Sequence, residues 1–158
     1  MNLTRRLLVG IGGLALMAAV MVGGSAAATV QAGSKVATIH FTAVLTPGTT
    51  TYAINSTSCT LTTPNGRTVA CALNGAGTLG PNGNSPATGE WAITTTNGKV
   101  ITLNLDHLNS CGTGSGVEVP ASGSPFPVVA TVPTLTTTGT TASGTIQVFD
   151  VGNRTVTC

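Results

Sequence analysis

Two stretches of the chain show the same alternation of apolar and polar residues around an Asn-Gly pair. The first spans 58–71 with its pair at 65–66, and the second spans 90–103 with its pair at 97–98. In both, a basic residue follows the pair and the alternation then resumes. Alternation is the pattern of a half-buried strand, and Asn-Gly is a strong hairpin signal. The sequence therefore predicts two β-hairpins at the centre of the fold.

The cysteines decide the turn length of the first hairpin. A three-residue turn at Pro64–Gly66 places Cys59 directly opposite Cys71, whereas a two-residue turn separates them onto different faces. Opposed residues in an antiparallel pair have Cα atoms about 4.5–5.5 Å apart, which is within the reach of a disulfide. The register therefore predicts a Cys59–Cys71 disulfide, which leaves Cys111 to pair with Cys158.

The same turn at 96–98 divides the second hairpin into two clean faces. The apolar face carries Trp91, Ile93, Ile101, Leu103 and Leu105, and the other face carries Glu90, Ala92, Thr94, Val100, Thr102 and Asn104. A slip of one residue would mix the two sets. Because Trp91 alternates with Ile93, we predict that it packs in the core. The competing interpretation is that Trp91 and Tyr52 stack on a sugar ring.

The remaining segments predict an all-β domain. Further strands are expected at 35–45, 50–54, 104–108, 128–132, 134–138, 144–150 and 154–158, the last two as a hairpin, with Pro133 as a strand break. The glycine-rich segments 74–89 and 112–116 are expected to be loops. Short strands with frequent turns predict an antiparallel two-layer β-sandwich, immunoglobulin-like or jelly-roll in type and stapled by disulfides.

The N-terminal segment has the order of a secretory signal peptide. A basic start with Arg5 and Arg6 precedes an apolar run at 7–22 and small residues at 23–28. We therefore predict a signal peptide over 1–28 and a single domain over 29–158, with cleavage before Thr29 or before Gly33. The alternative is an uncleaved membrane anchor, although the run is short for a membrane span and contains two glycines.

The cysteines and the net charge limit the compartment in which the protein is expected and the partners that it can bind. Four cysteines behind an export signal predict two disulfides and an oxidising compartment, so we expect the domain outside the cell or in the cell envelope. Two of the six basic residues lie in the leader, which leaves four basic against four acidic residues. This balance offers no basic patch for nucleic acid. It also removes a barrier to self-association.

The ionisable residues give only weak candidates for catalysis or metal binding. Asp106 and His107 are neighbours, but on a continuous strand they would point to opposite faces. His107 is expected to be a partly buried structural residue and His40 a surface residue. Glu90, Asn104 and Asp106 share one predicted face that could hold calcium, but a solvated polar face is the favoured interpretation. No catalytic residue, metal or cofactor is predicted.

These observations predict a non-enzymatic, secreted or cell-envelope protein that acts by surface contact in a structural or protein-interaction role. Its neutral, threonine-rich faces suit contact with other copies of the chain, a cell-wall polymer or another surface protein. The alternative is a carbohydrate-binding module, and the third class is a small secreted hydrolase. Glycosylation sequons begin at Asn55 and Asn153, and they matter if the source is eukaryotic.

Overall fold

The computed structural model describes residues 28–83 and 85–158, which form nine strands. The predicted leader falls outside the described residues, apart from Ala28 at its end. The strands are β1 (Thr29–Pro47), β2 (Thr51–Thr62), β3 (Thr68–Thr78), β4 (Gly89–Thr95), β5 (Val100–Asp106), β6 (Gly112–Val119), β7 (Phe126–Thr138), β8 (Thr141–Val151) and β9 (Arg154–Thr157).

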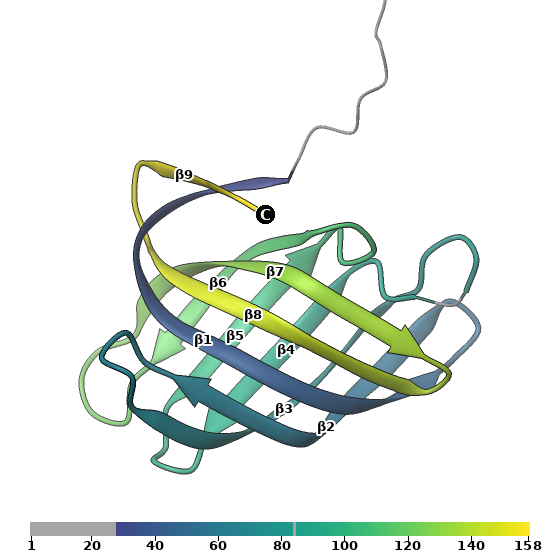
Figure 1. Cartoon of the computed structure of the whole chain (residues 1–158), viewed down its shortest axis with the longest axis horizontal. Helices are drawn as coiled ribbons and strands as arrows, with labels where there is room; N and C mark the ends of the chain where they lie inside the picture. Colours follow the sequence, from purple (N-terminus) through teal and green to yellow (C-terminus); the bar gives the residue numbers. More distant parts are fainter. Residues whose placement is uncertain (1–27, 84) are drawn as a thin grey trace, which may run out of the picture.

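The first eight strands close into an antiparallel barrel (Figure 1). Each strand from β1 to β8 pairs with the next one along the chain, and β8 returns to pair with β1. The barrel is therefore of the up-and-down type. The predicted two-layer sandwich is wrong, because the sheet closes on itself instead of folding into two packed sheets.

Glycines that face the interior explain why the sheet closes. They alternate along β3 and β6 as Gly75, Gly77, Gly112, Gly114 and Gly116. A Cβ added at Gly114 would lie 2.0 Å from the carbonyl oxygen of Asn104 on β5, and one at Gly116 would lie 1.7 Å from that of Thr102. Neighbouring backbones thus approach more closely than side chains permit, and the sheet curls sharply. The predicted loop at 112–116 and the first part of that at 74–89 are therefore wrong, since both are strand.

Apolar side chains fill the barrel. The predicted apolar face of the second hairpin is confirmed, since all of its members are buried: Trp91, Ile93, Ile101, Leu103 and Leu105. Alternate residues of β1 are buried as well: Ala37, Ile39, Phe41, Ala43 and Leu45. Trp91 is 1 % exposed and meets the edge of Phe41, with ring centroids 5.7 Å apart. Its Nε1–H donates to the Tyr52 hydroxyl at 3.0 Å, and that hydroxyl donates to the Thr88 carbonyl at 2.7 Å. The indole is thus fixed by packing and by hydrogen bonds.

Both Asn-Gly hairpins have the predicted three-residue turns. Gly66 and Gly98 take positive φ angles of 80° and 88°, the left-handed conformation that such a turn needs. Leu61 pairs with Val69 in the first hairpin, and Trp91 pairs with Leu103 in the second. The structure joins Cys59 to Cys71, with Cα atoms 4.9 Å apart, as the register predicts.

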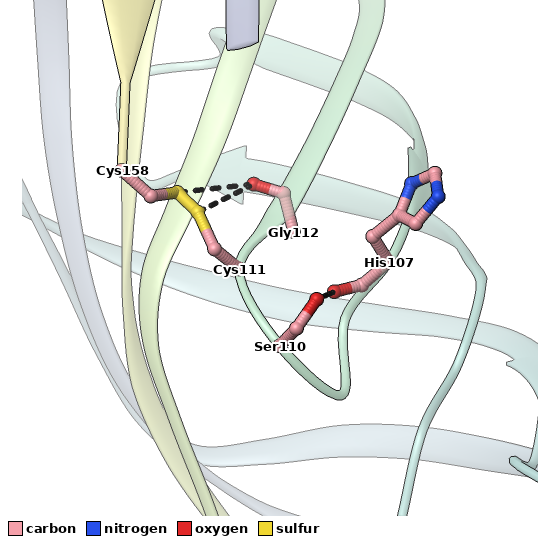
Figure 2. The surroundings of a disulfide bond; sticks show 5 residues. All are labelled: His107, Ser110, Cys111, Gly112 and Cys158. Carbon is pink, nitrogen blue, oxygen red and sulfur yellow. Dashed lines mark hydrogen bonds between the residues drawn. A yellow bond between two sulfur atoms is a disulfide. The ribbon is translucent and has the colours of Figure 1, made fainter. Parts of the chain in front are cut away.

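A two-stranded ribbon leaves the barrel at the N-terminal end of β1. Residues 29–32 pair with β9, so the predicted hairpin between 144–150 and 154–158 is wrong. The ribbon curls back along the β6 and β7 side (Figure 1), where Cys158 is bonded to Cys111 ahead of β6 (Figure 2). Thr131 and Phe149 lie next to inward-facing residues and so point outward, yet both are buried. The ribbon therefore covers this outer wall.

Pro133 lies inside β7 and does not separate two strands. The register between β7 and β8 shifts between Thr131 and Thr134, so the proline occupies an irregularity of the ladder. Because proline has no backbone N–H to donate, such a position is where a strand tolerates it. The predicted strand break is therefore a local shift within one strand.

Replacement of Trp91 by alanine should strongly destabilise the barrel. Truncation of a buried tryptophan typically costs about 3–5 kcal/mol, a large share of the roughly 5–15 kcal/mol that stabilises a small domain. We expect a much lower melting temperature for Trp91→Ala and blue-shifted tryptophan emission from the wild type. Red emission together with an unchanged melt would contradict the buried position.

Candidate functional site

An open groove of about 810 Å³ lies on the outer wall, where the end of β1 and β2 through β5 run side by side. Cross-strand pairing places Thr46, Ala53, Ala76, Glu90 and Asn104 in one row across these strands. Their neighbours along each strand face the interior, so this row faces outward. The groove is therefore on the side of the barrel that the ribbon leaves uncovered.

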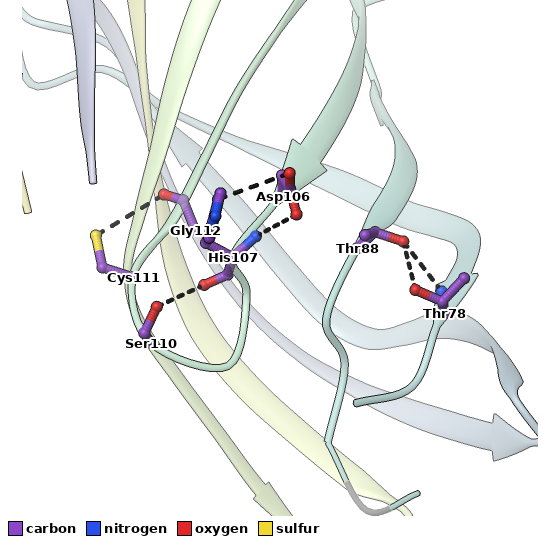
Figure 3. A network of polar contacts seen from close by, with 7 residues as sticks. All are labelled: Thr78, Thr88, Asp106, His107, Ser110, Cys111 and Gly112. Carbon is purple, nitrogen blue, oxygen red and sulfur yellow. Dashed lines mark hydrogen bonds and ion pairs between the residues drawn. The ribbon is translucent and has the colours of Figure 1, made fainter. Parts of the chain in front are cut away.

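The groove is lined by small residues, which we call its floor, and by threonines, which we call its rim. Ala53 and Ala76 present only methyl groups, and Gly77 and Gly89 present only backbone. Threonines form the rim. Thr78 and Thr88 are linked, with hydroxyl oxygens 2.8 Å apart (Figure 3). Such a surface offers close backbone approach and neutral hydrogen-bonding groups to a partner.

Glu90 is the only acidic residue that lines the groove, and it stands beside Asn104 as the hairpin register predicts. Its side chain is exposed, and none of the hydrogen bonds or ion pairs among the described residues involves it. The predicted neighbour Asp106 lies on the same face but is engaged by His107. In residues 28–83 and 85–158, no three His, Cys, Asp or Glu side chains gather in a way that could hold a metal ion.

Asp106 and His107 approach one another because β5 ends between them. His107 has a φ angle of 56° and leaves the strand, so the prediction that β5 continues through it is wrong. Its Nδ1 lies 3.7 Å from Asp106 Oδ2, and its backbone N–H donates to Asp106 Oδ1 at 2.8 Å. Its side chain is 64 % exposed, so the expected partial burial is also wrong.

The His107 ring is not aligned with the nearby serine hydroxyl. Ser110 Oγ donates to the backbone carbonyl of His107, on the side away from the ring (Figures 2 and 3). His40 is exposed, as predicted, and its Nδ1 lies 3.1 Å from Thr145 Oγ1 on the neighbouring strand. A serine hydrolase needs the serine hydroxyl within hydrogen-bond reach of the imidazole, and here that hydroxyl is directed to a carbonyl.

The aromatic side chains lie inside the molecule, which bears on carbohydrate binding. Phe41, Tyr52, Trp91 and Phe149 are buried, and Phe126 is half-buried. Tyr52 is one of the residues that line the groove, although it is buried, and its hydroxyl donates to the backbone carbonyl of Thr88. Burial raises the pKa of Tyr52 to about 12, although the hydrogen bond from Trp91 opposes the shift.

An ion pair near the opposite end of the barrel was not found by sequence reasoning. Lys99 Nζ lies 2.5 Å from Glu118 Oε1, and Glu118 is 3 % exposed while its neighbours Val117 and Val119 are 40 % exposed. The usual strand pattern is therefore inverted in β6. A signal existed, because the three-residue turn places Lys99 on the same face as the inward Ile101.

No family model matches the chain, and no curated protein or solved structure is significantly similar to it. The part of the chain that the structure describes contains no helix long and apolar enough to cross a membrane.

The buried Tyr52 predicts a loss of stability at alkaline pH. An unfolded tyrosine loses its proton near pH 10, whereas folded Tyr52 keeps its proton to about pH 12. Its contribution to stability is thus complete below pH 10 and disappears as the pH rises from 10 to 12. Since Tyr52 is the single tyrosine, phenolate absorbance reports it alone. We expect native phenolate to form only near pH 12, and a midpoint near 10 would contradict burial.

Proposed function

We propose that this protein is a non-enzymatic, secreted or cell-envelope protein that acts by surface contact through the outer-wall groove. The observation that carries the proposal is the position of the groove. The barrel interior is filled by side chains such as Trp91, Ile39 and Leu103, while the groove is open to solvent. A barrel packed in this way serves as a rigid support for an outer binding surface.

The two disulfides support an oxidising location. Cys59–Cys71 and Cys111–Cys158 leave no free cysteine among the described residues. Such bonds form outside the cytoplasm. Together with the leader-like sequence at 1–28, they favour export of the chain.

The ribbon distinguishes between the two expected cleavage positions. Residues Thr29–Ala32 supply the strand to which β9 is hydrogen-bonded. Cleavage before Gly33 would remove that strand, and with it all four residue pairs that hold β9 in the ribbon. The proposal therefore takes Thr29 as the first residue of the secreted protein.

A mass measurement of the secreted protein checks this assignment. We expect an N-terminus at Thr29, because this end keeps all four residue pairs of the ribbon. A mature form that begins at Gly33 would contradict it. An intact Met1 would contradict cleavage altogether.

A carbohydrate-binding role is the second candidate, because Glu90, Asn104 and the threonine rim offer hydrogen-bonding groups beside an apolar floor. Buried Trp91 and Tyr52 weaken it, since sugar platforms normally present an exposed aromatic ring. A glycan array therefore separates the candidates. Recognition of a soluble oligosaccharide that is lost in Glu90→Gln would favour the carbohydrate role.

A larger side chain in the groove should prevent a partner from binding there. In Ala76→Gln a longer neutral side chain would stand on the floor, and the matched control Ala72→Gln places the same side chain outside the groove on the same strand. Both alanines are exposed, so neither change disturbs the core. Retention would be measured on insoluble peptidoglycan, on chitin and on immobilised copies of the protein itself.

We expect Ala72→Gln to be retained like the wild type on at least one surface. Retention of Ala76→Gln on that surface should fall at least about tenfold, which corresponds to a loss of about 1.4 kcal/mol of binding free energy. Equal retention of the two variants would show that the groove is not the contact surface.

A further inference from the structure

The two Asn-Gly hairpins have the same turn but use their basic residues differently. In each, the threonine N–H donates to the carbonyl of the basic residue at 2.9 Å, Thr63 to Arg67 and Thr95 to Lys99. The same threonine hydroxyls donate to the asparagine of the turn. Lys99 then reaches inward to Glu118, whereas Arg67 is exposed. Among the described residues, no ion pair or hydrogen bond involves the Arg67 guanidinium.

We next ask which carboxylate could pair with Arg67, and the other charged residues after position 28 leave few candidates. The remaining basic residues contact their own molecule: Lys99 at Glu118, Lys35 over the Phe149 ring, and Arg154 at the Gly33 carbonyl. Among the acidic residues, Glu118 pairs with Lys99, the exposed Asp106 accepts a hydrogen bond from the backbone N–H of His107, and Asp150 is half-buried. Glu90, exposed in the groove, is therefore the carboxylate available for Arg67.

Arg67 and Glu90 of one molecule lie too far apart to meet. Arg67 follows the turn that ends β2, whereas the groove lies where β2 begins and β3 ends. The two sites are thus at opposite ends of the same hairpin, and Figure 1 shows the β2–β3 turn and the β1–β2 turn at opposite ends of the barrel. The complementary charges can pair only between copies.

We propose that copies of this protein associate head to tail, with the hairpin tip Thr63–Arg67 of one copy seated in the outer-wall groove of the next and Arg67 paired with Glu90. The groups on the hairpin tip are complementary to those in the groove. Pro64 is an apolar group for the alanine floor, the Asn65 amide suits the threonine rim, and a guanidinium binds a carboxylate in a planar, two-pronged geometry. The occupant of the groove is a second copy of the chain.

The tip is held in one conformation before it binds. Four hydrogen bonds fix Thr63 to the residues of its own turn, and Gly66 has a positive φ angle. A preorganised tip loses little conformational freedom on docking, which favours association. Because tip and groove are different surfaces, each copy presents one of each, and the contact extends into a ring or a filament.

This inference rests on the proposed function, since it names the partner of the same groove. Sedimentation velocity of the secreted protein over a range of concentrations would test it. The variants are Arg67→Glu, Glu90→Arg and the double charge swap. The double variant keeps the net charge of the wild type, so it controls for general electrostatic effects.

We expect the wild-type sedimentation coefficient to rise with concentration near 0.1 M salt and to rise less at 1 M, where the Debye length falls from about 10 Å to about 3 Å. Each single reversal places like charges together and should weaken association at least about tenfold. The double variant should recover association, and so should an equimolar mixture of the two single variants, since each tip then meets an opposite charge.

Three results would overturn the inference: a wild type that stays monomeric at every concentration, single reversals that associate like the wild type, or charge swaps that fail to restore association. If head-to-tail association is ruled out, the experiment with Ala76→Gln shows whether the proposed function of the groove is wrong as well. If Ala76→Gln still loses retention on peptidoglycan or chitin, the groove binds another partner and only self-association is wrong. If that variant also behaves like the wild type, both proposals fail.

Discussion

Contact between neighbouring backbones, made possible by inward-facing glycines, is the constraint on which this structure depends. At Gly114 and Gly116 the β5 carbonyls occupy the space that a Cβ would need. At Gly75 and Gly89 the absence of a Cβ also leaves room for the indole of Trp91. Close approach therefore curls the sheet and also provides the volume that the large side chains fill. The groove depends on this condition as well, because the backbones of Gly77 and Gly89 form part of its lining.

The two outer walls of the barrel have opposite roles. The ribbon of β1 and β9 covers one wall, buries Phe149 and is fastened by Cys111–Cys158. The wall formed by β2 through β5 stays open and carries the groove. One wall is thus covered and cross-linked, while the other is open to a binding partner. A surface supported by a packed core and by two disulfides can bind a partner without a large ordering cost.

Sequence reasoning succeeded where one hairpin defined its own register and failed where several strands acted together. The Asn-Gly turns gave the pairing of Cys59 with Cys71 and the burial of Trp91, because both follow from local alternation. Closure depends on contacts between β5 and β6, and there the alternating glycines resemble a loop in the sequence. The groove draws residues from five strands, so only its Glu90–Asn104 pair was predictable. The inward position of Glu118 was not predicted, because the valines on either side of it in the sequence suggest that they face inward instead.

The pairing of the chain's two ends has a consequence for the order of folding. β1 must meet β8 to close the barrel, and its first residues must meet β9, so the earliest strand waits for the last residues of the chain. Contacts of such long sequence separation form slowly. A chain that emerges from its N-terminus would expose this edge of β1 until β8 and β9 have followed, a state in which unpaired strands are prone to aggregate. The β2–β5 hairpins are local and can form early, so they offer β1 a first partner while the rest of the chain arrives.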